Sequence, residues 1–208
     1  MINIYTSNNP ATFKEANAVL RGQPSKGVSE KDKKMFREFA KILEKSIDIL
    51  CKTFPQKCRD NSPVYRGQSY CVSITGQTYT FDSFLSTSKQ ISQAELFFAE
   101  CSSSSVLFEM IDVQGIYVSD YSIYPREEEV LIKPTAKFRI TLNLNSSHVS
   151  THHPEIERMI HALKRTKIPK AFIKGTMIGF TSTSTALSGQ DFVGMALAMI
   201  VMYTSFGI

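Results

Sequence analysis

Apolar residues recur at spacings of three and four along two N-terminal segments, which is the period of one face of an α-helix. The longer segment, residues 29–52, has Ser29 as a suitable N-cap and is expected to end before Pro55. The shorter segment covers residues 10–21. The apolar positions of these two predicted helices are Phe13, Ala16 and Leu20, then Met35, Phe39, Ile42, Leu43, Ile47 and Leu50.

The pattern changes at Pro63 to short runs rich in β-branched and aromatic residues, separated by Gly, Ser and Pro. Residues 91–100, "ISQAELFFAE", interrupt these runs with helical spacing. Helices followed by strands with one inserted helix predict an α+β domain. The predicted strands are "VYRGQSYCV", "YTFDSFLS", "SVLFEMI", "GIYV", "EEVLI" and "FRITLNL".

A change in composition after Asn145 divides the chain into residues 1–145 and a C-terminal extension, 146–208. A helix near 154–165 and an apolar tail, 192–208, are expected there. The tail is shorter than the roughly 20 residues that cross a bilayer, so we expect a buried element and no transmembrane span. Residues 173–185 resemble residues 76–88, which leaves a degenerate half-repeat open, as well as packing of the extension on the core.

Composition and charge exclude several classes of function. The 208 residues include 42% hydrophobic and 21% charged residues, as in globular proteins, and the net charge of +5 is spread along the chain, so nucleic-acid binding is not expected. The N-terminus has no Sec-type signal pattern. The four cysteines lack metal-ligand spacing and are expected to be reduced thiols, and the histidines at 148–161 are expected in a solvated loop, so no metal is predicted.

Three motifs carry residues suited to chemistry: Arg66 in "VYRG", Ser86 to Ser88 in "FLSTS", and Glu127 to Glu129 in "EEEVLI". Each has an ordinary structural explanation: a salt bridge, a strand-to-helix turn and a solvated charge run. Alternation along an extended strand would place Glu127 and Glu129 on one face and Glu128 on the other. Paired carboxylates can stabilise positive charge or transfer protons, and arginine binds phosphate through two donors.

In this order and spacing the motifs resemble those of the arginine-type ADP-ribosyltransferases, which carry an Arg, a Ser-Thr-Ser and a Glu-x-Glu on successive core strands. The resemblance covers roughly residues 4–144. It implies a mixed two-sheet β core with N-terminal helices, and NAD as the co-substrate.

The resemblance also implies roles for single residues. Arg66 would hold the NAD diphosphate, with Gly67 near the nicotinamide amide. Ser86 would orient Glu129, and Thr87 and Ser88 would brace the surrounding strands. Glu129 would be the catalytic carboxylate that stabilises the ribosyl cation, Glu127 would activate the acceptor, and Glu128 would face solvent. Tyr121 and Tyr124 lie in the segment that corresponds to the family's acceptor-recognition loop, although both could equally be core aromatics.

The function expected from this resemblance is mono-ADP-ribosylation of a side chain on a target protein, by a bacterial toxin or effector. Such a virulence protein would be secreted without a Sec signal and act on a host protein in the host cytosol; a cytoplasmic location stays open. An NAD glycohydrolase toxin and a non-catalytic binding module are the alternatives. Arginine is the favoured acceptor, and threonine or another residue stays open.

Overall fold

The computed structural model describes residues 10–59, 61–68, 74, 76–98, 105–145, 154, 157–158 and 169–181. Its helices are α2 (Pro10–Leu20), α3 (Glu30–Thr53) and α4 (Ile91–Phe98), with two short 3-10 helices, η1 (Pro55–Lys57) and η2 (Pro125–Glu127). The strands are β1 (Val64–Gln68), β2 (Thr78–Phe81), β3 (Leu85–Ser88), β4 (Val106–Ile111), β5 (Ile116–Tyr117), β6 (Glu129–Ile132), β7 (Ala136–Asn145) and β8 (Ala171–Phe180). The predicted α+β class is confirmed.

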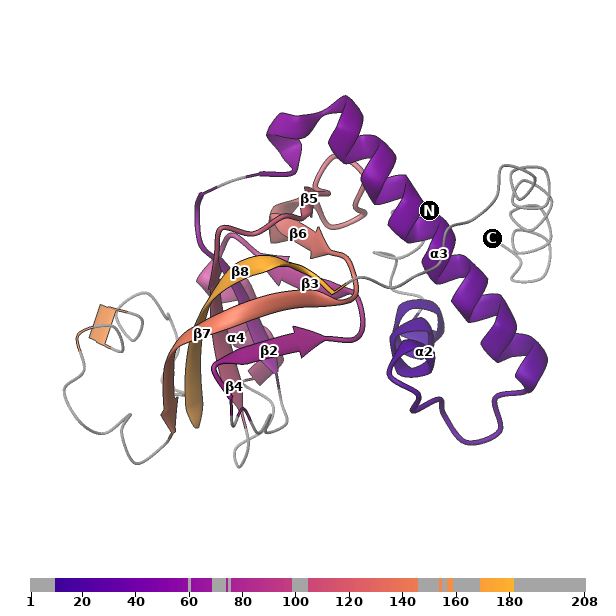
Figure 1. The fold of residues 1–208 in the computed structure, drawn as a ribbon, viewed down its shortest axis with the longest axis horizontal. Helices are drawn as coiled ribbons and strands as arrows, with labels where there is room; N and C mark the ends of the chain where they lie inside the picture. Colours follow the sequence, from indigo (N-terminus) through magenta and orange to yellow (C-terminus); the bar gives the residue numbers. More distant parts are fainter. Residues whose placement is uncertain are drawn as a thin grey trace.

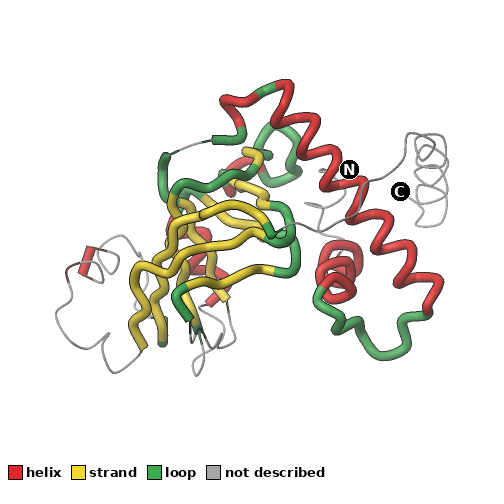
Figure 2. The backbone as a smooth tube through the Cα atoms, viewed as in Figure 1, coloured by secondary structure: helices red, strands yellow, loops and turns green. Residues whose placement is uncertain are grey.

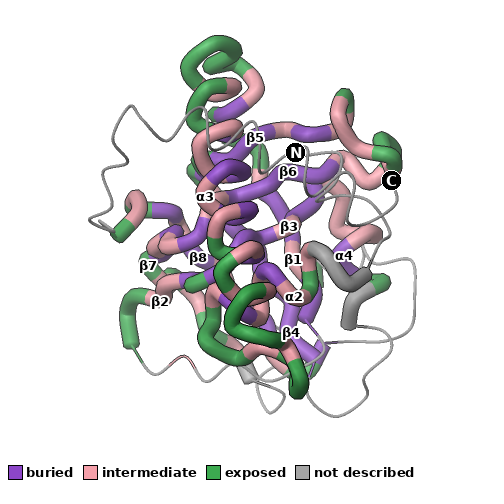
Figure 3. The backbone as a smooth tube through the Cα atoms, turned by 90° about the vertical axis from the view of Figure 1, so that its right-hand side faces the viewer, coloured by how far each residue is buried: buried purple, intermediate pink, exposed green. Residues whose placement is uncertain are grey.

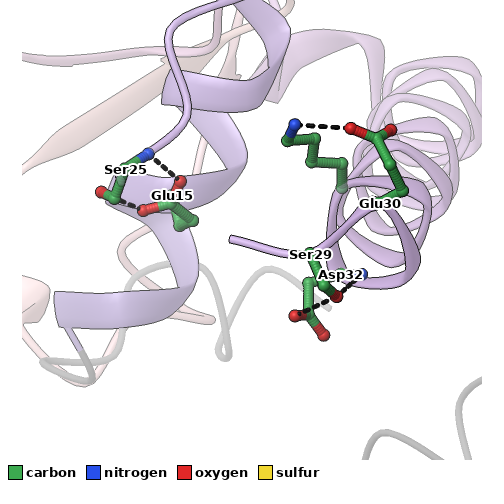
Figure 4. Close-up of polar contacts among 6 residues, drawn as sticks. Glu15, Ser25, Ser29, Glu30 and Asp32 are labelled. Carbon is green, nitrogen blue, oxygen red and sulfur yellow. Dashed lines mark hydrogen bonds and ion pairs between the residues drawn. The ribbon is translucent and has the colours of Figure 1, made fainter. Parts of the chain in front are cut away.

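Helix α3 follows the sequence prediction closely. The Ser29 hydroxyl accepts a hydrogen bond from the Asp32 backbone N–H, and Glu30 and Asp32 place negative charge in the first turn, near the positive end of the helix dipole (Figure 4). In the preceding α2–α3 connection, the Glu15 carboxylate accepts hydrogen bonds from the backbone and the hydroxyl of Ser25 (Figure 4). These local contacts define where α3 begins.

The strands form one hydrogen-bonded sheet in the order β2-β7-β8-β4-β1-β3-β6-β5, rather than the two sheets that the sequence led us to expect. The strands form one sheet because β1 and β3, near the centre of the strand order, are paired through the residues Tyr65 and Ser88. This narrow connection makes one sheet out of two groups of strands. All pairings are antiparallel except that of β4 with β8.

The helices and the sheet enclose three apolar clusters. Helices α2 and α3 lie on one side of the sheet and pack on Phe84, Ile116, Val118 and Leu131 (Figures 1 and 2). A second cluster gathers residues from strands of both groups, and α4 covers a third cluster through Ala94. Figure 3 shows the resulting pattern, with buried strands behind α2 and α3.

Strand β8 was not predicted from the sequence. It comes from the segment 146–208 and lies between β7 and β4, so this part of the segment belongs to the sheet. The two segments that resemble each other in sequence differ in structure. Residues 76–88 form two strands with a turn between them, whereas residues 171–180 form one strand. Most of the predicted helix at 154–165, the histidine cluster and the apolar tail lie outside the described residues. The division of the chain at residue 145 stays a proposal.

Two of the cysteines form a disulfide, so the prediction of four reduced thiols is wrong for Cys51 and Cys58. Cys51 lies in the last turn of α3, and Cys58 follows η1 directly. Because η1 turns the chain back toward α3, residues seven apart in sequence come to a Cα–Cα distance of 5.4 Å. Metal-ligand spacing was a poor guide to this pairing, which depends on the turn after the helix.

Reduction of this disulfide is expected to lower the free energy of unfolding by about 2 kcal/mol, because the bond restricts a short loop of the unfolded chain. Denaturant unfolding with and without a reductant measures the effect. The Cys51→Ala/Cys58→Ala variant is the control and should not respond to the reductant. An equal response of this variant would assign the effect to other cysteines.

Candidate active site

The fold brings the three motifs onto neighbouring strands. Arg66 lies on β1, residues 86–88 form most of β3, and Glu129 is the first residue of β6. Strand β3 lies between β1 and β6 in the sheet. Ser88 pairs with Glu129 in the register of β3 with β6, so the Ser-Thr-Ser strand is directly beside the glutamate.

The Arg66 side chain reaches from β1 to β3. One of its terminal nitrogens, Nη1, donates a hydrogen bond of 2.7 Å to the backbone carbonyl of Ser86. The side chain is partly buried, and Gly67 follows it as a buried residue opposite Leu107 of β4. This contact holds the guanidinium charge beside the strand that contacts Glu129.

Glu129 is a buried carboxylate, with a residue exposure of 5%. Its burial raises the pKa of Glu129 to about 7, and the negative charge of Glu127 adds to the rise. A hydrogen bond from the Ser86 side chain and the positive charge of Arg66 act in the opposite direction. The structure therefore places Ser86 and Arg66 where they stabilise the ionised form of Glu129.

Thr87 and Ser88 connect β3 to the chain around Glu129. The Thr87 hydroxyl donates to the Val130 carbonyl at 2.7 Å, and the Ser88 hydroxyl donates to the Glu127 carbonyl at 2.6 Å. Both residues are buried. Ser88 also accepts a hydrogen bond from the Gln90 backbone at 2.9 Å, so its hydroxyl links the start of α4 to the glutamate segment.

The glutamate run does not form the extended strand that we predicted from alternation. Pro125 to Glu127 form η2, Glu128 has left-handed backbone angles with φ of 46° and ψ of 45°, and the strand begins only at Glu129. The turn is closed by hydrogen bonds from the Glu127 and Glu128 backbone N–H groups. Glu127 and Glu129 therefore come close through a turn and not by sharing a strand face.

The two remaining glutamates, Glu127 and Glu128, are both partly buried, and the expectation that Glu128 faces solvent stays a prediction. Burial raises the pKa of Glu127 above its usual range. The Glu128 carbonyl accepts a hydrogen bond from the Lys89 backbone at 3.2 Å, which fastens this part of the turn to the residue after β3.

The two tyrosines of the predicted recognition loop differ in their surroundings. Tyr121 is partly buried against the cluster that α2 and α3 form with the sheet, and the Lys57 ammonium lies 5.5 Å from its ring centroid. The Tyr124 backbone N–H donates to the Ser122 hydroxyl at 3.0 Å, and the Tyr124 carbonyl accepts from the Glu127 backbone N–H. Lys57, which the sequence analysis did not single out, thus contacts this loop.

The described part of the chain contains no cluster of three or more His, Cys, Asp or Glu side chains arranged to hold a metal ion. None of the helices within the same residues combines the length and the apolar character that a membrane span requires.

The family model of the NAD:arginine ADP-ribosyltransferases matches residues 1–156, three quarters of the chain. The chain belongs to this family. NAD is the co-substrate of this family. The residues for which the sequence resemblance predicted roles in NAD chemistry, Arg66, Ser86 and Glu129, lie on adjoining strands. The search of curated proteins finds no match.

Solved structures of two bacterial ADP-ribosyltransferases and of a bacterial type III effector share the fold. Vis from Vibrio splendidus, in complex with an inhibitor, has a TM-score of 0.58 at 18% identity, with 89% of this chain and 74% of that chain covered. HopU1 of Pseudomonas syringae pv. Tomato has 0.52 at 20%, covering 80% and 65%. The type III effector XopAI from Xanthomonas axonopodis pv. citri has 0.55 at 16%, covering 86% and 61%. At these low identities, the structural likeness shows that the folds are shared.

The charges of the site fit NAD, which carries an anionic diphosphate and a cationic nicotinamide ring. In this ADP-ribosyltransferase, Arg66 offers a guanidinium suited to the diphosphate, and Glu129 offers a carboxylate whose ionised form a nearby cation would favour. Ser86 of β3 contacts both groups, through its backbone carbonyl to Arg66 and through its side chain to Glu129.

Arg66→Lys is expected to weaken NAD binding by about tenfold or more, because an ammonium cannot reproduce two parallel donors to a phosphate. Calorimetric titration in a Glu129→Gln background, which prevents NAD consumption, measures the affinity. Arg139→Lys, an exposed arginine on β7, is the matched control. Because Arg66 also contacts Ser86, thermal unfolding of both variants must be compared. Unchanged affinity in a folded Arg66→Lys protein would assign Arg66 a structural role.

Proposed function

We propose that the chain is a mono-ADP-ribosyltransferase that transfers ADP-ribose from NAD to an arginine side chain of a target protein. The observation that carries the proposal is the buried Glu129 carboxylate, which receives the Ser86 hydrogen bond beside Arg66. A carboxylate in these surroundings is suited to stabilise positive charge that develops nearby, since water does not screen it. The family description supports arginine as the acceptor.

NAD supplies an activated glycosidic bond with nicotinamide as the leaving group. Arg66 would bind the diphosphate, with Gly67 beside the nicotinamide end. Glu129, oriented by Ser86, would place its negative charge toward the ribose carbon that becomes electron-poor as the bond breaks. Thr87 and Ser88 would keep β3 and the glutamate turn in register through their hydrogen bonds. A dry, preformed carboxylate lowers the barrier because it needs no rearrangement during the reaction.

Glu127 is proposed to act on the acceptor. Burial raises the pKa of Glu127, so this carboxylate takes up a proton more readily than an exposed one. Its backbone is held by Ser88, while its charge is close enough to influence Glu129. A carboxylate at this position can remove a proton from a guanidinium as the guanidine nitrogen attacks the ribose carbon. Tyr121 and Tyr124 would contact the target protein around this acceptor.

We place the protein among bacterial effectors that act on host proteins. XopAI is described as a type III effector, and Vis has been solved in complex with agmatine, a small guanidine. Secretion without a Sec signal and action in the host cytosol are parts of this proposal.

Incubation of a eukaryotic cell lysate with the enzyme and biotinylated NAD tests the proposal. Mass spectrometry should identify ADP-ribose on arginine residues of one or a few proteins. Labelling on threonine or another residue would overturn the acceptor assignment, and release of nicotinamide without any labelled protein would favour the glycohydrolase alternative.

A further inference from the structure

Residues 119–126 form the segment that is proposed to contact the acceptor and are called the acceptor loop here. The loop is followed by Glu127 and Glu128, whose turn is hydrogen-bonded to the end of β3. The Val118 backbone N–H donates to the Glu129 carbonyl at 3.0 Å and so closes the base of the loop. The Ser88 hydroxyl and the Lys89 backbone hold the carbonyls of Glu127 and Glu128. These contacts fix the position of Glu127. At the start of the loop, the Tyr121 and Ser122 backbone N–H groups donate to the Val118 carbonyl at 2.8 Å and 2.9 Å.

Lys57 adds side-chain contacts to the first residues of the loop. Its ammonium forms a 2.5 Å ion pair with the Asp120 carboxylate and lies 5.5 Å from the ring centroid of Tyr121. The same ammonium lies 5.7 Å from the Phe54 ring. The Lys57 ammonium thus contacts two consecutive loop residues, the carboxylate of Asp120 and the aromatic ring of Tyr121.

The position of Lys57 is itself fixed from two directions. The Cys51–Cys58 disulfide ties the residue after Lys57 to the last turn of α3. The Cys58 carbonyl accepts a hydrogen bond from Gly115 at 3.3 Å. A Cβ at Gly115 would lie 3.0 Å from the Leu131 carbonyl, so the chain before β5 packs closely against β6 and a larger residue there would force its neighbours to shift. Lys57 therefore has a firm base on both α3 and the strand that begins at Glu129.

We infer that Lys57 is a positioning residue that holds the acceptor loop in the conformation competent to bind a protein acceptor. This inference rests on the proposed transferase function and adds a residue to it. Exposed loop residues Ile123, Pro125 and Arg126 follow the two residues that Lys57 contacts, so the ion pair sets how they are presented. Loss of the contact lowers the population of the competent loop, which raises the apparent dissociation constant of the acceptor in proportion.

The chain offers a closely matched control. Lys133 and Asp48 also form a 2.5 Å ion pair, with side-chain exposures of 22% and 59%, against 29% and 60% for Lys57 and Asp120. The Lys133 ammonium also lies over an aromatic ring, that of Phe180, at 4.8 Å. Exposed ion pairs add little to global stability, so both substitutions should leave the fold intact. Only one of the two pairs contacts the acceptor loop.

The experiment compares Lys57→Ala, Lys57→Arg, Asp120→Asn and Lys133→Ala in the full chain, with NAD and poly-arginine as the acceptor. The KM for poly-arginine should rise about threefold to fivefold in Lys57→Ala and in Asp120→Asn, and the double variant should show no further rise. Lys57→Arg should recover most of the affinity. The kcat at saturating poly-arginine, the KM for NAD and nicotinamide release without an acceptor should stay within about twofold of the wild type.

Hydrogen exchange gives a readout that is independent of activity. Amides of residues 119–126 should exchange faster in Lys57→Ala than in Lys133→Ala, while those of β6 stay unchanged.

Equal poly-arginine KM values for Lys57→Ala and Lys133→Ala, with active wild type, would overturn the inference and leave the proposed function standing. A loss of acceptor-free nicotinamide release parallel to the loss of transfer would also overturn it, because Lys57 would then support the NAD site. A wild type that releases nicotinamide but modifies neither poly-arginine nor any lysate protein would overturn the proposed function together with the inference.

Discussion

Glu129→Gln is expected to lower the rate of nicotinamide release by roughly two to three decades, equivalent to about 3–4 kcal/mol of transition-state stabilisation. The amide keeps the size of the carboxylate and can still accept the Ser86 hydrogen bond, but it lacks the charge that opposes the developing positive charge. Nicotinamide release at saturating NAD measures the effect. A folded Glu129→Gln protein with substantial activity would remove Glu129 from the catalytic role.

The raised pKa of Glu129 supplies two controls for this variant. If the ionised carboxylate is the active form, the wild-type kcat/KM for NAD should rise with pH and level off above about 7. Because the folded pKa lies above the unfolded value of 4.5, the native protein binds more protons between these values, so this group lowers wild-type stability as pH rises through that window.

Glu129→Gln does not titrate there, so its free energy of unfolding relative to wild type should increase between pH 5 and pH 8 by up to about 3 kcal/mol. Denaturant unfolding at the two pH values measures this difference. An inactive variant that is more stable at pH 8 would show that activity was lost through chemistry and not through unfolding.

Glu127→Gln is expected to suppress transfer to a guanidine acceptor by about a hundredfold or more, because it removes the group proposed to take the acceptor's proton. Nicotinamide release without an acceptor should change only severalfold, since Glu127 influences Glu129 through its charge alone. Glu128→Gln is the matched control and should alter neither reaction much, because its fixed contact is made by its backbone carbonyl. Both rates should be measured on the same preparations of each variant.

The reverse result, with Glu128 essential and Glu127 dispensable, would contradict the assignment within the turn. An equal loss of both reactions in Glu127→Gln would instead indicate that the two carboxylates act together on NAD.

The sequence was a good guide wherever the signal was local or ordered along the chain. Ser29 and the apolar positions of α3 defined a helix that begins and ends almost where predicted, because capping and amphipathic period act within a few turns. The order of Arg66, Ser86 and Glu129 placed three motifs on separate strands. Strand pairing then made these strands neighbours, which no single motif specifies.

The sequence was a poor guide where a turn or a distant contact decides the structure. Alternation predicted an extended glutamate segment, but Pro125 starts η2 and Glu128 adopts left-handed angles before β6 begins. Strand β8 depends on pairing with β4 and β7 across more than 20 residues of chain, which its own pattern did not reveal. Lys57 gave no signal because its importance lies in contacts with Asp120 and Tyr121, over 60 residues away.

The ratio of ADP-ribosyl-agmatine formed to nicotinamide released, measured by mass spectrometry with purified wild-type enzyme, NAD and saturating agmatine, tests the central claim most directly. A transferase with Glu127 acting on the acceptor and Glu129 on NAD should give a ratio close to one, and the Glu127→Gln variant a ratio close to zero with nicotinamide still released. Nicotinamide release by the wild type with free ADP-ribose as the only product would contradict transfer to a guanidine and identify the enzyme as an NAD glycohydrolase.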